Sequence, residues 1–221
     1  MPYKECWEYQ QMLFNDLLAK QGDGSDFVGT IIFVEHPAVY TLGKSGKMSN
    51  MLIDEARLKA LGAEFYHIDR GGDITFHGEG QVVCYPILDL EKLGIGLRHY
   101  IEILEESIIE TVAEYGICGR RLEGATGVWL CDETEGSDGE KEQRNWRKIC
   151  AIGVKASRFV TMHGLALNAS TDLKWFTMIN PCGFVDKGVT SISKEVGHIV
   201  DFEEVKQLLV ANLTKLLTNE K

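Results

Sequence analysis

A cysteine in a tight loop is the first residue of this sequence that could do chemistry. Cys182 stands in Asn180-Pro181-Cys182-Gly183, where a preceding proline and a following glycine predict a sharp turn that exposes a small side chain. A thiol becomes a strong nucleophile when it ionises, and a nearby cation lowers its pKa. Most single cysteines are instead buried or incidental, so the spacing alone leaves a nucleophile and a structural thiol both open.

A lysine at the start of an apolar strand is the matching candidate for a base. Lys148 stands in Arg147-Lys148-Ile149-Cys150-Ala151-Ile152-Gly153-Val154-Lys155, and such a run can desolvate its amine and lower its pKa. The alternative is a strand-end lysine whose ammonium reaches water, which is the usual case. The sequence does not show whether the two residues meet, because 34 positions separate Lys148 from Cys182.

The densest group of unusual residues is a glycine-rich segment. It reads Arg70-Gly71-Gly72-Asp73-Ile74-Thr75-Phe76-His77-Gly78-Glu79-Gly80-Gln81. Glycines let a ligand approach the main chain closely, although two tight turns between strands would use them equally well. The segment precedes a strand rather than a helix, so it is not a dinucleotide-binding fingerprint, and residues 43–47 (GKSGK) lack the pattern of a phosphate-binding loop. Nothing in these motifs requires ATP.

Two histidines complete the set of candidate site residues. His163, in Thr161-Met162-His163-Gly164-Leu165-Ala166-Leu167-Asn168, could orient a catalytic group or be a core histidine with satisfied hydrogen bonds. Together with His77 it raises the question of a metal. No third ligand stands at a recognisable spacing, so we expect no metal site.

Hydrophobic periodicity predicts the elements that must position these residues. Helices are expected at 3–19, 53–62, 97–115 and 202–217, and strands at 28–35, 64–69, 73–77, 81–88, 127–130, 149–155 and 159–167. The polar, charged stretch 132–145 predicts an exposed hairpin loop. This order favours an α+β fold in which helices pack on a mostly antiparallel sheet, with residues 1–221 forming one domain.

Composition narrows the class of protein. The formal net charge of −10 argues against non-specific nucleic-acid binding. No apolar run is long enough to span a bilayer and no secretory signal is recognisable, so we expect a cytoplasmic protein with mostly reduced, buried thiols. The basic residues nevertheless gather along one part of the chain, which suits an acidic protein partner or a solvated charged face: Arg120, Arg121, Arg144, Arg147, Lys148, Lys155 and Arg158.

An ordered series of short blocks carries a family resemblance. The blocks are Glu35-His36-Pro37 with Tyr40-Thr41-Leu42-Gly43, Arg70-Gly71-Gly72 through Tyr85-Pro86, Gly127-Val128-Trp129, Lys148-Ile149, Gly153-Val154, Thr161-Met162-His163-Gly164, Pro181-Cys182-Gly183 and Gly188-Val189-Thr190-Ser191. In this order they resemble the lipoyl(octanoyl) transferases, the octanoyl-[acyl carrier protein]:protein N-octanoyltransferases of lipoate biosynthesis. Any one of these blocks alone would be weak evidence for the family.

The resemblance implies a fold and a reaction. The fold is that of the catalytic domains of lipoate- and biotin-protein ligases. Cys182 matches the nucleophile that takes octanoate from acyl carrier protein, and Lys148 matches the lysine that lowers the pKa of that thiol and transfers protons. The acceptor is a lysine of the lipoyl domains of 2-oxoacid dehydrogenase complexes or of the glycine-cleavage H protein.

The resemblance also implies where the acyl chain binds. It assigns this role to Arg70–His77, to Ala151, Ile152 and Gly153, and to Gly164, Leu165 and Ala166, with His163 in support. No cofactor is implied, because the octanoyl-phosphopantetheine group arrives on acyl carrier protein as a substrate. We expect a monomer.

The sequence departs from the family pattern at two positions, and two rival functions remain. Glu79 stands where proline is common, and Asp73 where glutamine is frequent. One rival is an ATP-dependent lipoate- or biotin-protein ligase of the same fold, which needs no cysteine. The other is an inactive protein that binds lipoyl domains or acyl carriers without turnover, which retention of both Cys182 and Lys148 disfavours.

Overall fold

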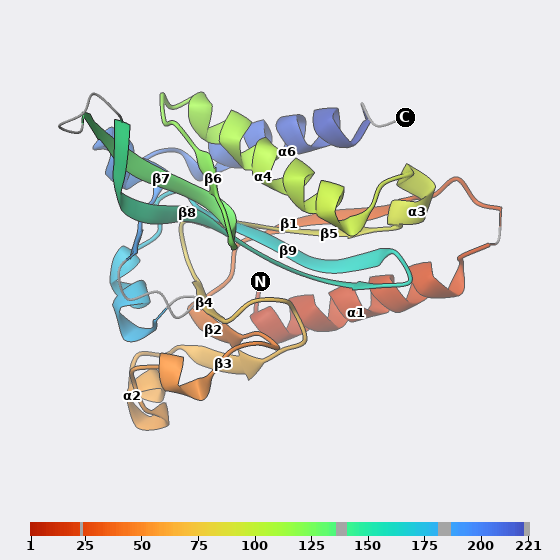
Figure 1. The fold of residues 1–221 in the computed structure, drawn as a ribbon. Helices are drawn as coiled ribbons and strands as arrows, with labels where there is room; N and C mark the ends of the chain where they lie inside the picture. Colours follow the sequence, from red (N-terminus) through yellow and green to blue (C-terminus); the bar gives the residue numbers. More distant parts are fainter. Residues whose placement is uncertain (23, 136–140, 181–186, 219–221) are drawn as a thin grey trace.

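The computed structural model describes residues 1–22, 24–135, 141–180 and 187–218. Within these ranges the strands form two sheets (Figure 1). The helices are α1 (Tyr3–Ala19), α2 (Glu55–Ala60), α3 (Leu90–Leu93), α4 (Leu97–Ala113), α5 (Ile192–Val196) and α6 (Phe202–Thr218), with short 3-10 helices η1 (Met48–Asn50) and η2 (Leu173–Met178).

The larger sheet has seven strands in the described residues. Its strands are β1 (Gly29–Val34), β5 (Gln81–Leu88), β9 (Val160–Asn168), β8 (Lys141–Ser157), β7 (Ala125–Glu135) and β6 (Arg120–Leu122), in that spatial order. Neighbours along this path pair antiparallel. A short strand, β10 (Gly188–Val189), pairs parallel with β8 outside this path. The expected α+β fold with a mostly antiparallel sheet is confirmed.

Helices cover both faces of the larger sheet. In Figure 1, α4 and α6 lie side by side over one face, and α1 runs along the other. The α4 and α6 side is the main core, where Tyr100, Leu104 and Ile108 of α4 are fully buried. The central strands β5 and β9 are buried on both faces, so they show a continuous apolar run instead of the alternation of a half-exposed strand.

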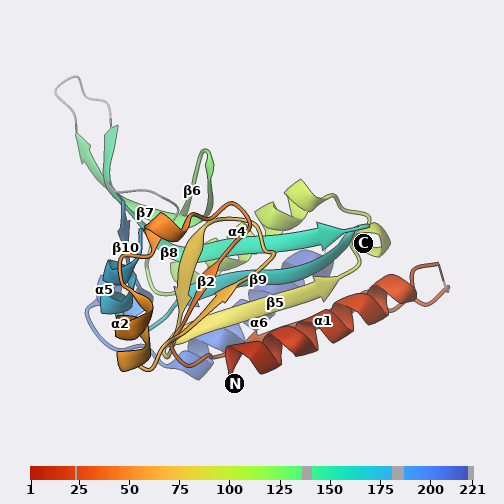
Figure 2. The same ribbon diagram turned by 90° about the horizontal axis from the view of Figure 1, so that it is seen from below.

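The smaller sheet lies below the larger one, beside the N-terminal end of α1 (Figures 1 and 2). Its strands are β3 (Glu64–His67), β2 (Val39–Leu42) and β4 (Ile74–His77), in that order. Strand β2 pairs parallel with β3 and antiparallel with β4. A small separate core of Tyr40, Leu42, Ile74 and Phe76 fixes this sheet against η2.

Several predicted boundaries differ from the structure. The expected helix at 53–62 is shorter, because Asp54 caps its start by accepting a hydrogen bond from the Arg57 N–H at 2.8 Å. The expected loop at 132–145 is wrong in extent. Strands β7 and β8 continue as a paired arm, with Asp132 opposite Arg144, and this arm projects from the body in Figure 2. Both faces of the arm are polar, so it has no hydrophobic alternation to reveal strands.

Sequence reasoning missed the shortest elements, β2, β6, β10, α3 and α5. The four residues of β2 are all buried and give no alternating pattern. In the described part of the chain, no helix combines the length and apolar character needed to cross a bilayer.

Candidate active site

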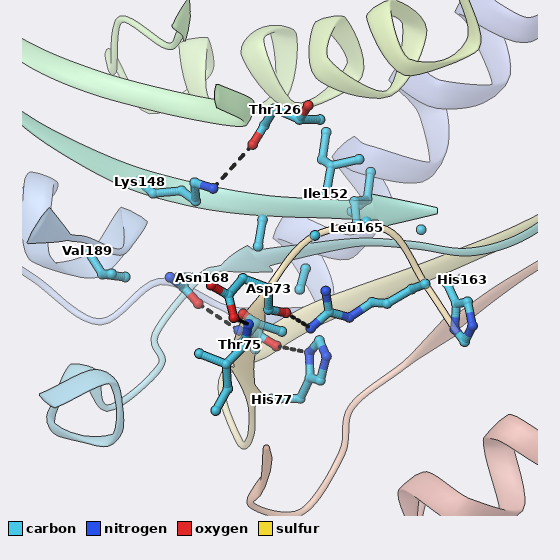
Figure 3. Close-up of a pocket in the computed structure, with 18 of the residues that line it drawn as sticks. Asp73, Thr75, His77, Thr126, Lys148, Ile152, His163, Leu165, Asn168 and Val189 are labelled. Atoms are coloured by element: carbon cyan, nitrogen blue, oxygen red, sulfur yellow. Dashed lines mark hydrogen bonds between the residues drawn. The ribbon is translucent and has the colours of Figure 1, made fainter. Parts of the chain in front are cut away.

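A cavity of about 380 Å³ lies where the smaller sheet faces the larger one. We call it the inter-sheet cavity. Figure 3 shows its lining side chains converging from both sheets, with Thr126 at the start of β7 and Lys148 on β8 on one side and His77 on β4 on the other. The lining residues are Tyr3, Ser45, Arg70, Gly72, Asp73, Ile74, Thr75, His77, Gln81, Tyr85, Gly124, Ala125, Thr126, Lys148, Ala151, Ile152, Gly153, His163, Gly164, Leu165, Ala166, Asn168, Phe176 and Val189.

Most of the residues predicted to form the site line this cavity. They include Lys148, His163, most of the Arg70–His77 segment and both short strand segments, 151–153 and 164–166. Gly71 and Phe76 are not among the lining residues. The Gly71 N–H donates to the Val154 carbonyl at 2.9 Å, and fully buried Phe76 stacks on Trp175 with ring centroids 5.1 Å apart. Both therefore pack the walls. A role of the lining residues in substrate binding stays a prediction.

Lys148 points into the cavity from β8. Its side chain is only 8% exposed, and its Nζ donates to the Thr126 carbonyl oxygen at 3.2 Å (Figure 3). The same Nζ lies 4.5 Å from the centre of the Trp129 ring. The expectation of a lysine drawn into an apolar strand is confirmed, and the alternative of a strand-end lysine reaching water is wrong.

Cys182 lies outside the described residues. The chain is described up to Asn180, whose N–H donates to the Asn50 carbonyl at 2.8 Å, and again from Lys187. Beyond that point, Val189 pairs with Lys148 in the parallel β10–β8 ladder and lines the cavity. The chain on either side of Cys182 is therefore anchored to the elements that form the cavity.

The five described cysteines are free thiols, as the sequence predicts for a reducing environment. Burial raises the pKa of Cys6 to about 11, and it raises the pKa values of Cys84 and Cys150 well above the usual range. Thiols with such pKa values are poor nucleophiles at neutral pH. These three cysteines are therefore structural.

Arg70 holds the glycine-rich segment in place. Its buried guanidinium donates to the carbonyl oxygens of Thr41 at 2.8 Å, Gly71 at 2.9 Å and Asp73 at 2.7 Å. Arginine is suited to this because its planar fork donates in several fixed directions. The side chain thus ties β2 to the turn before β4, and its methylene stem approaches β8 near Gly153.

Asp73 and Glu79, the two departures from the family pattern, lie in different surroundings. The Asp73 carboxylate accepts hydrogen bonds from the Asn50 side chain at 2.5 Å and the Ile74 N–H at 2.7 Å. It therefore anchors the loop that contains Ser45 at the cavity. Glu79 is exposed and is not among the lining residues. The Glu79 carboxylate therefore does not border the inter-sheet cavity.

A chain of hydrogen bonds leads from β4 to the β10 segment. His77 Nδ1 donates to Gln81 Oε1 at 2.8 Å, Gln81 Nε2 donates to Asn168 Oδ1 at 2.8 Å, and Asn168 Nδ2 donates to the Thr190 carbonyl at 2.9 Å. Burial lowers the pKa of His77 to about 3, so the ring is neutral at pH 7. The chain fixes its Nδ1–H tautomer and links both walls of the cavity.

His163 lies at the other end of the cavity from Lys148 (Figure 3). It is 1% exposed and has a left-handed backbone with φ of 62°. Its Nε2 donates to the Asp69 carboxylate at 3.1 Å, while its buried Nδ1 has no hydrogen-bond partner among the described residues. Burial lowers the pKa of the ring, which favours the neutral form. The structure therefore does not bring His163 to Lys148, and its supporting role stays a prediction.

Several lining residues were missed by sequence reasoning. The principal ones are Tyr3, Gln81, Tyr85, Thr126, Asn168, Phe176 and Val189. A polar residue at the end of an apolar strand, such as Gln81, was the available signal, because a buried polar group needs a hydrogen-bond partner. Tyr3 gave no such signal in the sequence, because only the packing of α1 brings it to the cavity. No group of three or more His, Cys, Asp or Glu side chains in the described ranges is arranged to hold a metal ion.

Comparison with known proteins decides the family. A model described as the lipoyl protein ligase A/B catalytic domain matches residues 2–214. This chain belongs to that family. It is 53% identical over 220 residues to an octanoyltransferase of Bacteroides fragilis, covering 100% of this chain and 96% of the relative. It is also 53% identical over 221 residues to an octanoyltransferase of Bacteroides thetaiotaomicron, covering 100% and 93%. The resemblance to lipoyl(octanoyl) transferases is confirmed, and this member of the ligase A/B family is an enzyme of the transferase class.

Solved structures support the fold of this ligase A/B family member. A bipartite lipoate protein ligase from Thermoplasma acidophilum matches with a TM-score of 0.65 and 13% identity, covering 95% of this chain and 78% of the other. A lipoate-protein ligase A bound with ATP matches with a TM-score of 0.65 and 14% identity, covering 95% and 80%. At this identity the likeness shows the shared ligase fold alone.

Proposed function

We propose that this enzyme transfers an octanoyl group from octanoyl-acyl carrier protein to the lysine of a lipoyl domain, through a thioester on Cys182. The observation that carries the proposal is the position of Lys148. Its amine is buried in the inter-sheet cavity, and the strand directly beside it belongs to the segment that follows Cys182. The sequence relationship to octanoyltransferases supports the same acyl group.

The reaction divides into two exchanges. In the first, the Cys182 thiolate attacks the carbonyl of the incoming thioester, the new carbon–sulfur bond forms, and the phosphopantetheine thiolate leaves and takes a proton. In the second, a lysine ε-amine attacks the acyl-Cys182 carbonyl, the amide forms, and the Cys182 thiol is regenerated with the proton that the amine loses. Lys148 carries these protons, because a lysine beside a thiol both favours the thiolate and can return a proton to a leaving group.

Energetics are consistent with a reaction that needs no cofactor. A thioester is already activated, so exchange between two thiols is nearly neutral and amide formation is downhill. Neither step requires ATP, which fits the missing phosphate-binding loop. The cavity volume of about 380 Å³ lies within the range of about 300–1,000 Å³ typical of small-molecule sites. Burial of the octanoyl chain there would contribute about 0.8 kcal/mol per methylene.

An acidic acyl carrier protein should bind to a positively charged surface of the enzyme. The ion pairs of the structure alter where on the enzyme we expect that surface. Most of the basic residues between Arg144 and Lys155 are paired internally. Arg147 binds Glu195 at 2.7 Å, and Lys155 binds Asp69 at 2.6 Å. The earlier expectation of a landing surface there therefore loses its main support.

We place the carrier instead beside Ser45, at the rim of the inter-sheet cavity. Lys44 and Lys47 flank Ser45 and are exposed, and neither forms an ion pair with another residue in the described ranges. Opposite charges across such a surface steer association and orient the partner. A carrier bound there would present its thioester to the cavity.

Mass spectrometry tests the proposal directly. After incubation with octanoyl-acyl carrier protein, we expect one added octanoyl group that hydroxylamine removes and that is absent in Cys182→Ser. Transfer to a lipoyl domain should then proceed without ATP. If no acyl group is added and acylation of the lipoyl domain requires ATP and free octanoate, the enzyme is a ligase and the proposal is wrong. Binding of both partners without transfer would instead indicate an inactive binding protein.

A further inference from the structure

We propose that Trp129 is a positioning residue for Lys148, holding its ammonium over the indole ring so that the ammonium can stabilise an adjacent thiolate. The inference rests on the proposed function, because it concerns how Lys148 acts on Cys182. Trp129 does not line the inter-sheet cavity, so it would act only through Lys148.

The first observation is a direct cross-strand pair. Trp129 of β7 stands opposite Lys148 of β8, and the Nζ of Lys148 lies 4.5 Å from the centre of its ring. Trp129 is only 2% exposed and Lys148 only 8%. An ammonium over an aromatic face is held more strongly when water is excluded, and tryptophan offers the strongest face. The ring therefore restrains the position of the lysine ammonium.

The second observation concerns the hydrogen bond that Lys148 makes. Its Nζ donates to the Thr126 carbonyl at 3.2 Å, while the indole Nε1–H of Trp129 donates to the carbonyl of the adjacent residue, Ala125, at 2.9 Å. Trp129 therefore fixes the backbone that presents the accepting oxygen. One side chain thus restrains Lys148 in two ways, through its ring face and through its N–H group.

The third observation is a local irregularity that brings the two residues opposite each other. The β7–β8 register shifts between Val128 and Trp129, so that Val128 pairs with Cys150 and Trp129 with Lys148. Bulges of this kind redirect side chains and are common beside active sites. A regular ladder would have left a different residue facing the lysine.

The buried carboxylate of Glu105, paired with the exposed side chain of Arg121, supports β7 at this irregularity. Gly127 has φ of 117°, and a Cβ there would lie 2.5 Å from the Cys150 carbonyl oxygen. Its N–H donates to Glu105 Oε1 at 3.0 Å, and Arg121 binds the other oxygen of this carboxylate at 3.0 Å. A charged group on α4 therefore holds β7 in place two residues before Trp129, which contacts Lys148.

The experiment compares Trp129→Leu, which removes the aromatic face, with Trp129→Phe, which keeps an aromatic ring but loses the N–H. The rate of Cys182 alkylation by iodoacetamide is measured against pH, together with the pH profile of kcat/KM for octanoyl transfer. We expect Trp129→Leu to raise the apparent pKa of the Cys182 thiol and to lower kcat/KM at pH 7 by roughly 3- to 30-fold. Trp129→Phe should recover most of the pKa shift.

Two controls separate positioning from folding. Trp7→Leu removes a partly buried tryptophan of α1 and should leave both pH profiles unchanged. Thermal unfolding of every variant identifies loss of folded protein, which lowers amplitudes without moving a pKa. An unchanged thiol pKa in folded Trp129→Leu overturns the inference. If the wild-type enzyme forms no acyl-Cys182, it is the proposed function that fails instead.

Discussion

Val189 lies directly opposite Lys148 in the parallel pair formed by β10 and β8. The pairing is secured by the Thr190 N–H, which donates to the Lys148 carbonyl at 2.9 Å. Six positions separate Cys182 from Gly188, the first residue of β10, and such a segment spans at most about 20 Å. The connection therefore limits how far Cys182 can lie from the strand beside Lys148, and it makes their proposed meeting sterically possible.

Replacing Lys148 tests its role as proton carrier. We expect Lys148→Ala to remain folded and to lower the rate of octanoyl transfer by about 10²- to 10⁴-fold, the usual contribution of a positioned acid or base. Acylation of Cys182 and release to the lipoyl domain should both be slow in single-turnover measurements. Lys155→Ala is the matched control, because Lys155 lies on the same strand outside the cavity lining. Unchanged turnover in Lys148→Ala removes this lysine from the mechanism.

The periodic elements could be predicted from the sequence, whereas their side-chain contacts could not. The spacing of Leu97, Ile101 and Leu104, four and then three residues apart, matches a helical face, and α4 begins at the predicted residue. The pairing of Trp129 with Lys148 depends on a register shift in β7, and no sequence pattern signals a one-residue slip between two strands. Tyr3 reaches the cavity only because α1 packs on β5 and β9.

The glycines of the site show a second limit to what the sequence alone can predict. Sequence reasoning interprets the glycines as positions where a ligand can approach the main chain closely. The structure shows instead that backbone occupies much of the space beside them. A Cβ on Gly164 would lie 2.2 Å from the Cys84 carbonyl, and one on Gly153 would lie 2.7 Å from the Gly71 carbonyl. These glycines allow strands and loops to approach, which only the tertiary packing reveals.

Gly153→Ala should therefore be destabilising. The added methyl group meets the main chain of the Arg70–Gly72 turn, which cannot move without breaking the bond from the Gly71 N–H to the Val154 carbonyl. We expect a loss of about 1–3 kcal/mol in the free energy of unfolding, measured by urea denaturation. Gly96→Ala, at the N-cap of α4 with open space around its Cβ position, should cost less, about 0.5 kcal/mol, because alanine is a poorer N-cap than glycine. Equal stability of the two variants would contradict the packing argument.

Charge reversal at Lys44 and Lys47 tests the proposed carrier surface. The double variant Lys44→Glu/Lys47→Glu should raise the KM for octanoyl-acyl carrier protein by about tenfold or more at low salt, with a smaller effect as salt screens the contact. Octanoyl-pantetheine, a small uncharged donor, should react at the wild-type rate. Lys215→Glu on α6 is the control, because α6 covers the opposite face of the larger sheet (Figure 1). If the KM for octanoyl-acyl carrier protein is unchanged in the double variant, this surface does not bind the carrier.

Buried neutral histidines predict a loss of stability under mildly acidic conditions. Burial lowers the pKa of His36 to about 4 and that of His77 to about 3, while the unfolded chain has the ordinary value near 6.5. Below pH 6.5 the unfolded state therefore binds more protons than the folded state, and the free energy of unfolding falls as the pH decreases. Each histidine should contribute a loss of roughly 1.5–2 kcal/mol between pH 7 and pH 5.

Urea denaturation across this pH range measures the effect, and a histidine variant assigns it. Asp69 has a lowered pKa because it accepts a hydrogen bond from His163, so its own contribution is lost only below about pH 4 and does not enter this window. His36→Gln keeps a donor and an acceptor at the position between the Met1 carbonyl and the Tyr85 hydroxyl but cannot titrate. We expect it to be less stable at pH 7 and to show a shallower dependence on pH, by up to about one proton. Equal slopes in the two proteins would mean that His36 takes up protons equally in the folded and unfolded states.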